Sequence, residues 1–229
     1  MPSDCEILST TYLFHDIPPA QLPALAEFLR PISRHFPKGG TVLLAGDERS
    51  EIGIVASGSL QAEKHTPAGT SFVMAHLGPG DVFGDVLGGG RVKSPVTITA
   101  AEDCRVLFLP YHALITPQGT PPPGHSKLVQ NLAAGISEKY FALDRRLDLL
   151  LLKSLRAKLC AYLLDQAKQN GAFTFSVPFG RAGMASYLNC DRSALSRELS
   201  RMQGEGLLEV YQNSFKLLAP EALKNQARR

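Results

Sequence analysis

The sequence contains no uninterrupted run of about 18 apolar residues, the length that a helix needs to cross a bilayer. Its first six residues, 1–6, also lack the basic and then apolar pattern of a secretory signal. Four cysteines are scattered along the chain without a CxxC or similar ligand spacing. We therefore expect a cytoplasmic protein with reduced thiols, and neither a disulfide framework nor a zinc site.

The composition, with 44% hydrophobic and 20% charged residues, is that of a folded globular protein. A length of 229 residues allows two modest domains. The net charge of +3 is unevenly distributed: residues 1–152 contain 12 Lys and Arg against 15 Asp and Glu, whereas residues 153–229 contain 12 against 6. The basic excess lies in the last third of the chain, which favours a polyanionic partner for that part.

Residues 36–110 consist of short apolar stretches separated by turns that contain glycine. The stretches have the length and β-branched content of strands, as in residues 41–44 and 105–109. They predict a compact all-β sandwich or barrel. A short helix is expected before it, over residues 18–29, and the proline-rich segment 116–124 should end the domain.

Residues 125–152 contain no proline, and apolar side chains recur at every third or fourth position. The stripe consists of Leu128, Leu132, Ile136, Tyr140, Leu143, Leu147 and Leu150. It predicts a helix roughly 40 Å long at 1.5 Å per residue, which is too long for one small domain to cover. An ordinary core helix is one interpretation. The length and the preceding proline-rich segment favour the seam of a two-stranded homodimer.

Residues 180–202 have the pattern of two short helices joined by a tight turn. Their inner faces are predicted from the apolar spacing: Met184, Ala185 and Leu188, then Leu195, Leu199 and Met202. We expect the crossing of the helices at Ala185, where only a small side chain fits. The turn ends in Asp191, which is expected to cap the second helix by accepting a backbone N–H bond.

This pattern leaves four polar residues on the outer face of the second helix: Arg192, Ser193, Ser196 and Arg197. Arginine can bond the O6 and N7 atoms of guanine together, and serine can bond a base or a phosphate, so the segment is suited to the DNA major groove. Arg181, at the start of the first helix, joins the predicted DNA-binding set. A basic, solvated helix is the alternative. Residues 205–218 predict two short strands beside these helices, a β wing.

The sequence resembles the Crp/Fnr superfamily of transcription regulators over nearly its whole length. Its glycine-containing segments are similar to the family's cyclic-nucleotide-binding fold, and two later segments to its helix-turn-helix. These segments are 36–40, 45–47, 54–60 and 77–85, then 191–197 and 206–208.

The resemblance implies an α+β fold with three parts. Residues 1–120 would form a double-stranded β-helix, a jelly roll like that of cyclic-nucleotide-binding domains, that senses an effector. Residues 121–152 would form the dimerisation helix, and residues 153–229 the winged helix-turn-helix that binds DNA. The resemblance also implies RNA polymerase as a partner and a two-fold-symmetric site on double-stranded DNA.

By the same resemblance, Arg192, Ser193 and Arg197 occupy the family's base-reading positions. Ser193 stands where many members have glutamate. We therefore expect the DNA site to differ from theirs in the bases that this glutamate would read.

In cyclic-AMP-binding relatives, a Phe-Gly-Glu turn and a later Arg-Ser pair hold the ribose and the cyclic phosphate. This chain has Phe83-Gly84-Asp85 and Lys93-Ser94 instead, and residues 141–144 of the helix contain no Ser or Thr to meet the base. Asp is one methylene shorter than Glu, and Lys lacks the bidentate fork of Arg. These differences argue against cyclic AMP and favour another small effector. Its predicted binding residues are Gly84, Asp85, Lys93, Ser94, Tyr140 and Leu143, with Lys93 as an anion partner.

No cofactor is expected. The family's iron–sulfur members concentrate cysteines near the N-terminus, where this chain has only Cys5. Haem would need an axial donor such as His76 or Cys104, and a lone strand histidine is far more often structural. A cupin enzyme would need closely spaced histidines, and His65 and His76 have no neighbouring partner.

We therefore expect a protein that is not an enzyme. The prediction is a sequence-specific transcription regulator whose DNA affinity is controlled by a small molecule bound between the β domain and the dimer helix. The alternative is an effector-binding module that signals through protein contacts without binding DNA.

Overall fold

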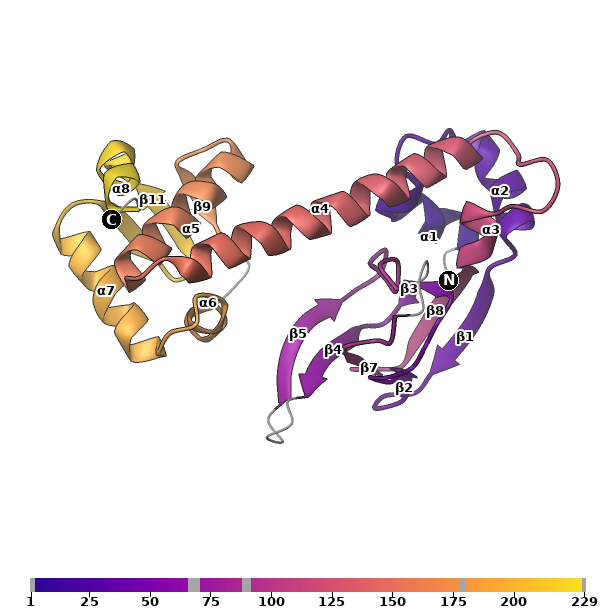
Figure 1. Ribbon diagram of the computed structural model, residues 1–229, viewed down its shortest axis with the longest axis horizontal. Helices are drawn as coiled ribbons and strands as arrows, with labels where there is room; N and C mark the ends of the chain where they lie inside the picture. Colours follow the sequence, from indigo (N-terminus) through magenta and orange to yellow (C-terminus); the bar gives the residue numbers. More distant parts are fainter. Residues whose placement is uncertain (1–2, 66–70, 88–91, 178–179, 228–229) are drawn as a thin grey trace. The chain divides into compact units, whose positions relative to one another are not determined.

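The computed structural model describes residues 3–65, 71–87, 92–177 and 180–227. It divides into two compact units, Met1–Lys139 and Tyr140–Arg229 (Figure 1). The boundary falls inside the long helix α4 (His125–Leu151), so that each unit contains one part of this helix. Each unit is described by itself below.

The first unit is built around two four-stranded sheets whose paired strands are all antiparallel. One sheet has the order β1 (Ile32–Phe36), β8 (Cys104–Pro110), β3 (Glu51–Ser57) and β6 (Val82–Phe83). The other has the order β2 (Thr41–Leu43), β7 (Thr97–Ala100), β4 (Leu60–His65) and β5 (Ser71–Leu77). The sequence prediction of an all-β sandwich in this part of the chain is confirmed.

The first sheet has an apolar core on each of its faces, because β3 and β8 are buried on both sides. Along β8, Val106 and Phe108 belong to the core between the sheets, whereas Leu107 and Leu109 belong to the core under the helices. Successive side chains of a strand point to opposite faces, so an unbroken apolar run is what such a strand requires. Helices must therefore cover the outer face of this sheet.

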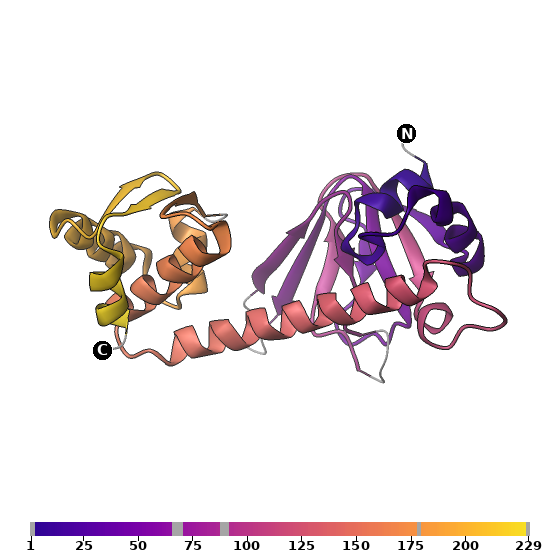
Figure 2. The same cartoon turned by 90° about the horizontal axis from the view of Figure 1, so that it is seen from above.

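That cover comes from both ends of the unit's sequence (Figure 2). The covering elements are α1 (Asp4–Thr10), η1 (Tyr12–Phe14), η2 (Pro19–Gln21), α2 (Leu22–Leu29), α3 (Tyr111–Ile115) and the start of α4. Helix α1 begins with a capping box, in which the Ser3 hydroxyl accepts from the Glu6 amide and the Glu6 carboxylate accepts from the Ser3 amide. Leu128 and Leu132 bury the first turns of α4 against the same core.

The second unit is a helical domain with a small antiparallel sheet, in the order β10 (Leu208–Tyr211), β11 (Ser214–Leu217) and β9 (Thr174–Ser176). Its helices are α5 (Leu155–Asn170), α6 (Arg181–Tyr187), α7 (Arg192–Gly204) and α8 (Pro220–Ala227), with the last part of α4. The predicted wing is the β10–β11 hairpin (Figure 2), whose two-residue turn places Gln212 at a φ of 51°.

The second part of α4 leaves several apolar side chains exposed. They are Tyr140, Phe141, Leu143, Leu147 and Leu151, each more than half exposed in the single chain. Within the described residues, no helix combines the length and the apolar character that crossing a bilayer requires.

Candidate nucleic-acid interface and sensor site

Helices α6 and α7 pack through the apolar side chains that the sequence pattern assigned to their inner faces. All six are buried: Met184, Ala185, Leu188, Leu195, Leu199 and Met202. The turn between the helices is tight, since Asn189 has a φ of 52° and the Cys190 amide donates to the Ala185 carbonyl oxygen at 3.0 Å. This packing fixes which side of α7 points outward.

The outward side of α7 presents Arg192, Ser193, Ser196 and Arg197, all of them exposed. Residues three or four apart are neighbours on a helix surface, so these four form one continuous face over the first two turns. No ion pair joins Arg192 or Arg197 to any residue that the structure describes. Two arginines are therefore free to bind an anion or a base edge.

The acidic residues of the same region are neutralised by an arginine on a different helix. Arg156 of α5 donates from Nε to Glu198 at 2.5 Å, and from both Nη atoms to the two carboxylate oxygens of Glu205 at 2.7 Å. These hydrogen bonds lower the pKa of Glu205, and they raise the pKa of Arg156. Glu198 also accepts from Arg201. The charges of Glu198 and Glu205 are thus offset within the domain.

One detail of the sequence prediction is wrong. Asp191 occupies the N-cap position of α7, but its side chain makes no capping hydrogen bond, and only its backbone carbonyl accepts, from the Leu195 amide. Asp191, Arg192 and Ser193 are all exposed, so solvent can satisfy the first amides of the helix without the carboxylate.

Arg181, which was predicted to bind DNA, lies apart from the α7 residues. It begins α6, and its guanidinium carbon lies 5.5 Å from the ring centroid of Phe215, above the ring. The Nη1 atom is buried without a hydrogen-bond partner among the described residues, and burial lowers the pKa of the group. The structure therefore places Arg181 against the β wing rather than on the open face of α7.

Asp85, one of the predicted effector-binding residues, is held by two side chains of the first unit. It is 2% exposed, and its Oδ2 atom accepts from the Tyr12 hydroxyl at 2.6 Å and from Lys139 Nζ at 2.5 Å. Burial, and then the hydrogen bond to Asp85, raise the pKa of Tyr12. Gly135 allows this arrangement, because a Cβ there would lie 2.2 Å from the Tyr12 ring. Asp85 thus ties the N-terminal segment to α4.

The interior of the β sandwich beside Gly84 is filled by aromatic side chains. The rings of Phe83 and Phe108 meet edge to face at 6.2 Å, and a Cβ on Gly53 would lie 2.1 Å from the Phe83 ring. The remaining cavity has a volume of about 10 Å³, enough for roughly one water molecule. Arg49 and Glu51 also line it. A nucleotide could enter only if these side chains moved.

The other predicted effector residues are placed in different surroundings. Lys93 is exposed, whereas Ser94 is buried and its hydroxyl donates to the Val96 carbonyl oxygen at 2.7 Å. Tyr140 and Leu143 belong to the second unit and are 63% and 67% exposed. Among the described residues, no group of three or more His, Cys, Asp or Glu side chains is suited to hold a metal ion.

Comparison with known proteins gives two domain matches in the order that the structure shows. The family model described as the cyclic nucleotide-binding domain matches residues 33–116, and the Crp-like helix-turn-helix domain matches residues 157–226. Together they match more than half of the chain. The protein belongs to the Crp/Fnr family of transcription regulators.

Relatives of this Crp/Fnr regulator match it along most of their length. The cyclic AMP receptor protein of Thermus thermophilus is 28% identical over 202 residues, covering 86% of this chain and 88% of the relative. The fumarate and nitrate reduction regulatory protein of Salmonella typhimurium is 26% identical over 216 residues, covering 90% and 82%. The crystal structure of the Thermus thermophilus catabolite activator protein shares the fold, with a TM-score of 0.56, 23% identity and coverage of 95% and 99%.

Membership of the Crp/Fnr family confirms the predicted fold: an antiparallel β-sandwich, a long helix and a C-terminal helix-turn-helix. It also makes the chain a DNA-binding regulator from a family of dimeric transcription regulators, which are not enzymes. The relatives bear names that refer to different signals, so the family alone does not identify the effector of this regulator.

Sequence reasoning missed three residues of the regulator that form ion pairs with carboxylates at the two candidate sites or hydrogen-bond to them. Tyr12 and Lys139 bind Asp85 from 73 and 54 residues away, and Arg156 binds Glu205 from 49 residues away. The only signal available beforehand for Lys139 was its position on the apolar-striped helix. No spacing rule of a helix or a strand connects partners so distant in the chain.

Proposed function

We propose that this protein is a homodimeric regulator that reads a two-fold-symmetric DNA site through α7 of each protomer. The observation that carries the proposal is the exposed face of α7, which presents Arg192 and Arg197 beside Ser193 and Ser196, with no ion pair from either arginine to a residue that the structure describes. Guanidinium groups in the first turns of a recognition helix can reach base edges. The positive end of the α7 dipole adds attraction for the phosphates nearby.

We infer separate roles for the residues of this face. Arg197 and Arg192 serve as the base-reading groups, and Ser196 bonds a base or a phosphate. Ser193, which stands in place of the glutamate found in many members, is shorter and uncharged, so it would accept from cytosine N4 more weakly than a carboxylate does. The DNA site should therefore differ from that of glutamate-containing members at the corresponding base pair. Arg181 would contribute at most a phosphate contact, because its guanidinium packs over the ring of Phe215.

We further propose that a small effector, bound where the β-sandwich meets α4, sets the DNA affinity. Gly84, Asp85, Lys93, Ser94, Tyr140 and Leu143 are the proposed binding residues. An anionic effector would compete with Asp85 for Lys139, which is the partner that links this carboxylate to α4. Releasing that ion pair would change the position of the long helix and so the spacing of the two recognition helices, which half-sites on one DNA face place about 34 Å apart. Cyclic AMP fits poorly, since the cavity beside Gly84 measures only about 10 Å³. RNA polymerase is a proposed partner on family grounds.

Selection of bound sequences from a random duplex pool tests the DNA-binding proposal. The experiment uses the full-length protein at about 150 mM salt, where non-specific attraction to phosphates is already weakened. Recovery of a two-fold-symmetric site is the expected result. The matched control is the double variant Arg192→Ala/Arg197→Ala, which removes the two free guanidinium groups and should recover no common sequence.

If the selection recovers no site, the protein either does not bind specific DNA or is an effector-dependent regulator in its inactive state, and these two explanations have to be distinguished. The selection is therefore repeated with Lys139→Met, which breaks the ion pair to Asp85 in the way that an effector would. A symmetric site recovered only with this variant would support control through Lys139. No enrichment from either protein, despite a folded dimer in solution, would favour the alternative of a signalling module without DNA binding.

A further inference from the structure

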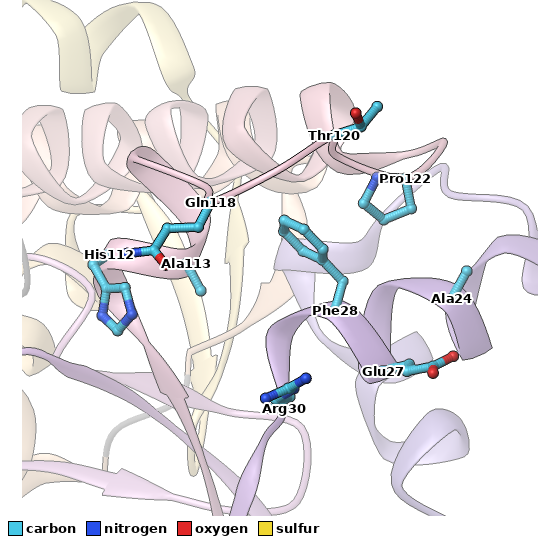
Figure 3. Close-up of a pocket in the computed structure, with 9 residues that line it drawn as sticks. All are labelled: Ala24, Glu27, Phe28, Arg30, His112, Ala113, Gln118, Thr120 and Pro122. Atoms are coloured by element: carbon cyan, nitrogen blue, oxygen red, sulfur yellow. The ribbon is translucent and has the colours of Figure 1, made fainter.

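A second cavity of the first unit lies away from the aromatic-filled interior of the sandwich. It has a volume of about 550 Å³, within the range of small-molecule sites. Its walls come from α2, α3 and the proline-rich segment that precedes α4. Figure 3 shows Phe28 in the middle of the ring of lining residues, with His112 on one side, Glu27 on the other and Arg30 between them. Sequence reasoning assigned no function to these residues.

The cavity carries two opposite charges that do not neutralise each other. Glu27 and Arg30 both line it, yet no ion pair joins either of them to the other or to any further residue in the described part of the chain. Beside them the Phe28 ring and Pro122 offer apolar surface, and Gln118 adds an amide. Both charged side chains are exposed to water, and a ligand with one cationic and one anionic group on a small apolar body could pair with both of them.

The backbone at Arg30 is in a conformation that an ordinary side chain avoids. Arg30 ends α2 with φ 49° and ψ 62°, the left-handed region in which glycine is the usual residue. The Arg30 amide donates to the Ala26 carbonyl oxygen at 2.9 Å, so this conformation ends the helix and turns the chain at the cavity wall. Arg30 carries the only guanidinium among the described residues that line the cavity, which makes it the group suited to bind an anion there.

We propose that this cavity binds a small aminocarboxylic acid. The Arg30 guanidinium binds the carboxylate of the ligand in a bidentate contact, and His112 is a second donor to this carboxylate. The Glu27 carboxylate accepts from the ammonium group of the ligand. The side chain of the ligand packs on Phe28 and Pro122. This site is distinct from the proposed effector site at Asp85, and its binding reaction does not depend on DNA.

The cavity is connected directly to the first residue of α4. His125 is buried, its ring meets Phe28 edge to face at 5.6 Å, and its Nε2 atom lies 3.3 Å from the Ala113 carbonyl oxygen, to which it donates. Phe28 and Ala113 both line the cavity. A ligand that fixes these two residues therefore also fixes the start of the long helix, where the Leu128 amide donates to the Gly124 carbonyl oxygen at 3.0 Å.

The test is calorimetric titration of the full-length protein with L-leucine, L-methionine and L-phenylalanine. At least one of them should bind, and its analogues that lack either the amino or the carboxyl group should bind at least about tenfold more weakly. Binding should be lost in Arg30→Asn, since asparagine tolerates the left-handed conformation and so preserves the fold. Glu27→Gln should reduce binding in the same way. Lys38→Gln, an exposed change elsewhere in this unit, should leave it intact.

The effect of the ligand on α4 is tested separately, by measuring hydrogen exchange of the backbone amides in residues 128–132. The bound ligand should slow their exchange, while amides of α5 stay unchanged. The site is refuted if none of the three amino acids binds, or if the singly charged analogues bind equally well. Binding that leaves exchange in residues 128–132 unaltered refutes the action on α4. Neither readout involves DNA, so both outcomes are separate from success or failure of the proposed DNA recognition.

Discussion

Replacement of Arg197 by alanine tests the proposed recognition surface most directly. The guanidinium is exposed and has no ion pair among the described residues, so its removal should change the free energy of unfolding by no more than about 0.5 kcal/mol. A bidentate contact to a base is worth about 1–3 kcal/mol. A two-fold-symmetric dimer loses two such contacts, or about 2–6 kcal/mol, which corresponds to a roughly 30-fold to 2 × 10⁴-fold weaker Kd.

The assay is fluorescence anisotropy with the selected duplex, and with duplexes that carry each base change in both half-sites. Lys168→Ala is the matched control, because it removes one exposed positive charge from α5 of the same unit. Arg197→Ala should lose discrimination at one base pair of each half-site, and Lys168→Ala should lose none. The reasoning is refuted if Arg197→Ala weakens every duplex equally and reduces the salt dependence, which is the signature of a phosphate contact.

Three further changes test the internal contacts. Lys139→Met leaves the buried Asp85 with one hydrogen-bond donor, so urea denaturation should show that the first unit is destabilised by about 1–3 kcal/mol. The double variant that also carries Asp85→Asn should regain most of this stability. Gly53→Ala places a Cβ 2.1 Å from an aromatic ring and should destabilise the sandwich by about 1–3 kcal/mol in thermal melts; an unchanged melting temperature would contradict the packing. Arg156 lowers the pKa of Glu205 below 4.5, so their contact stabilises the fold above that pH, and this stabilisation is lost as the pH falls through the lowered pKa. In Arg156→Met, the free energy of unfolding should therefore decrease less between pH 6 and pH 3 than it does in the unaltered protein.

The parts of this structure that follow local periodicity could be predicted from the sequence. The outward face of α7 followed from the spacing of Leu195, Leu199 and Met202, because a helix that buries one stripe must expose the opposite one. The sandwich followed from short apolar runs between glycine turns, and the wing from two strands around the turn at Gln212. Each of these predictions rests on the spacing of residues that are close together in the sequence, although the strands of the sandwich pair over long separations, as Ile32 does with Phe108.

The contacts that hold the buried and paired carboxylates could not be predicted from local periodicity. The partners of Asp85 come from η1 and from α4, and their meeting depends on the complete fold of the first unit. The cavity walled by α2 and the proline-rich segment could not be foreseen either, since it forms only when residues 24–30 and 112–122 pack side by side. The cap at Asp191 was predicted from its residue type and its place at the end of the turn, but an exposed carboxylate has water as a competing partner.

In the proposed homodimer, the exposed apolar side chains of α4 also make the amount of protein in the cell a regulatory quantity. In that dimer the partner protomer would cover Tyr140, Phe141, Leu143, Leu147 and Leu151, so the folded state would be linked to concentration by mass action. The melting temperature should therefore rise with protein concentration. When most of the protein is monomeric and the symmetric DNA site is far from saturated, its occupancy varies with the square of the protomer concentration. A twofold change in synthesis then alters occupancy about fourfold, a sensitivity to gene dosage that requires no effector.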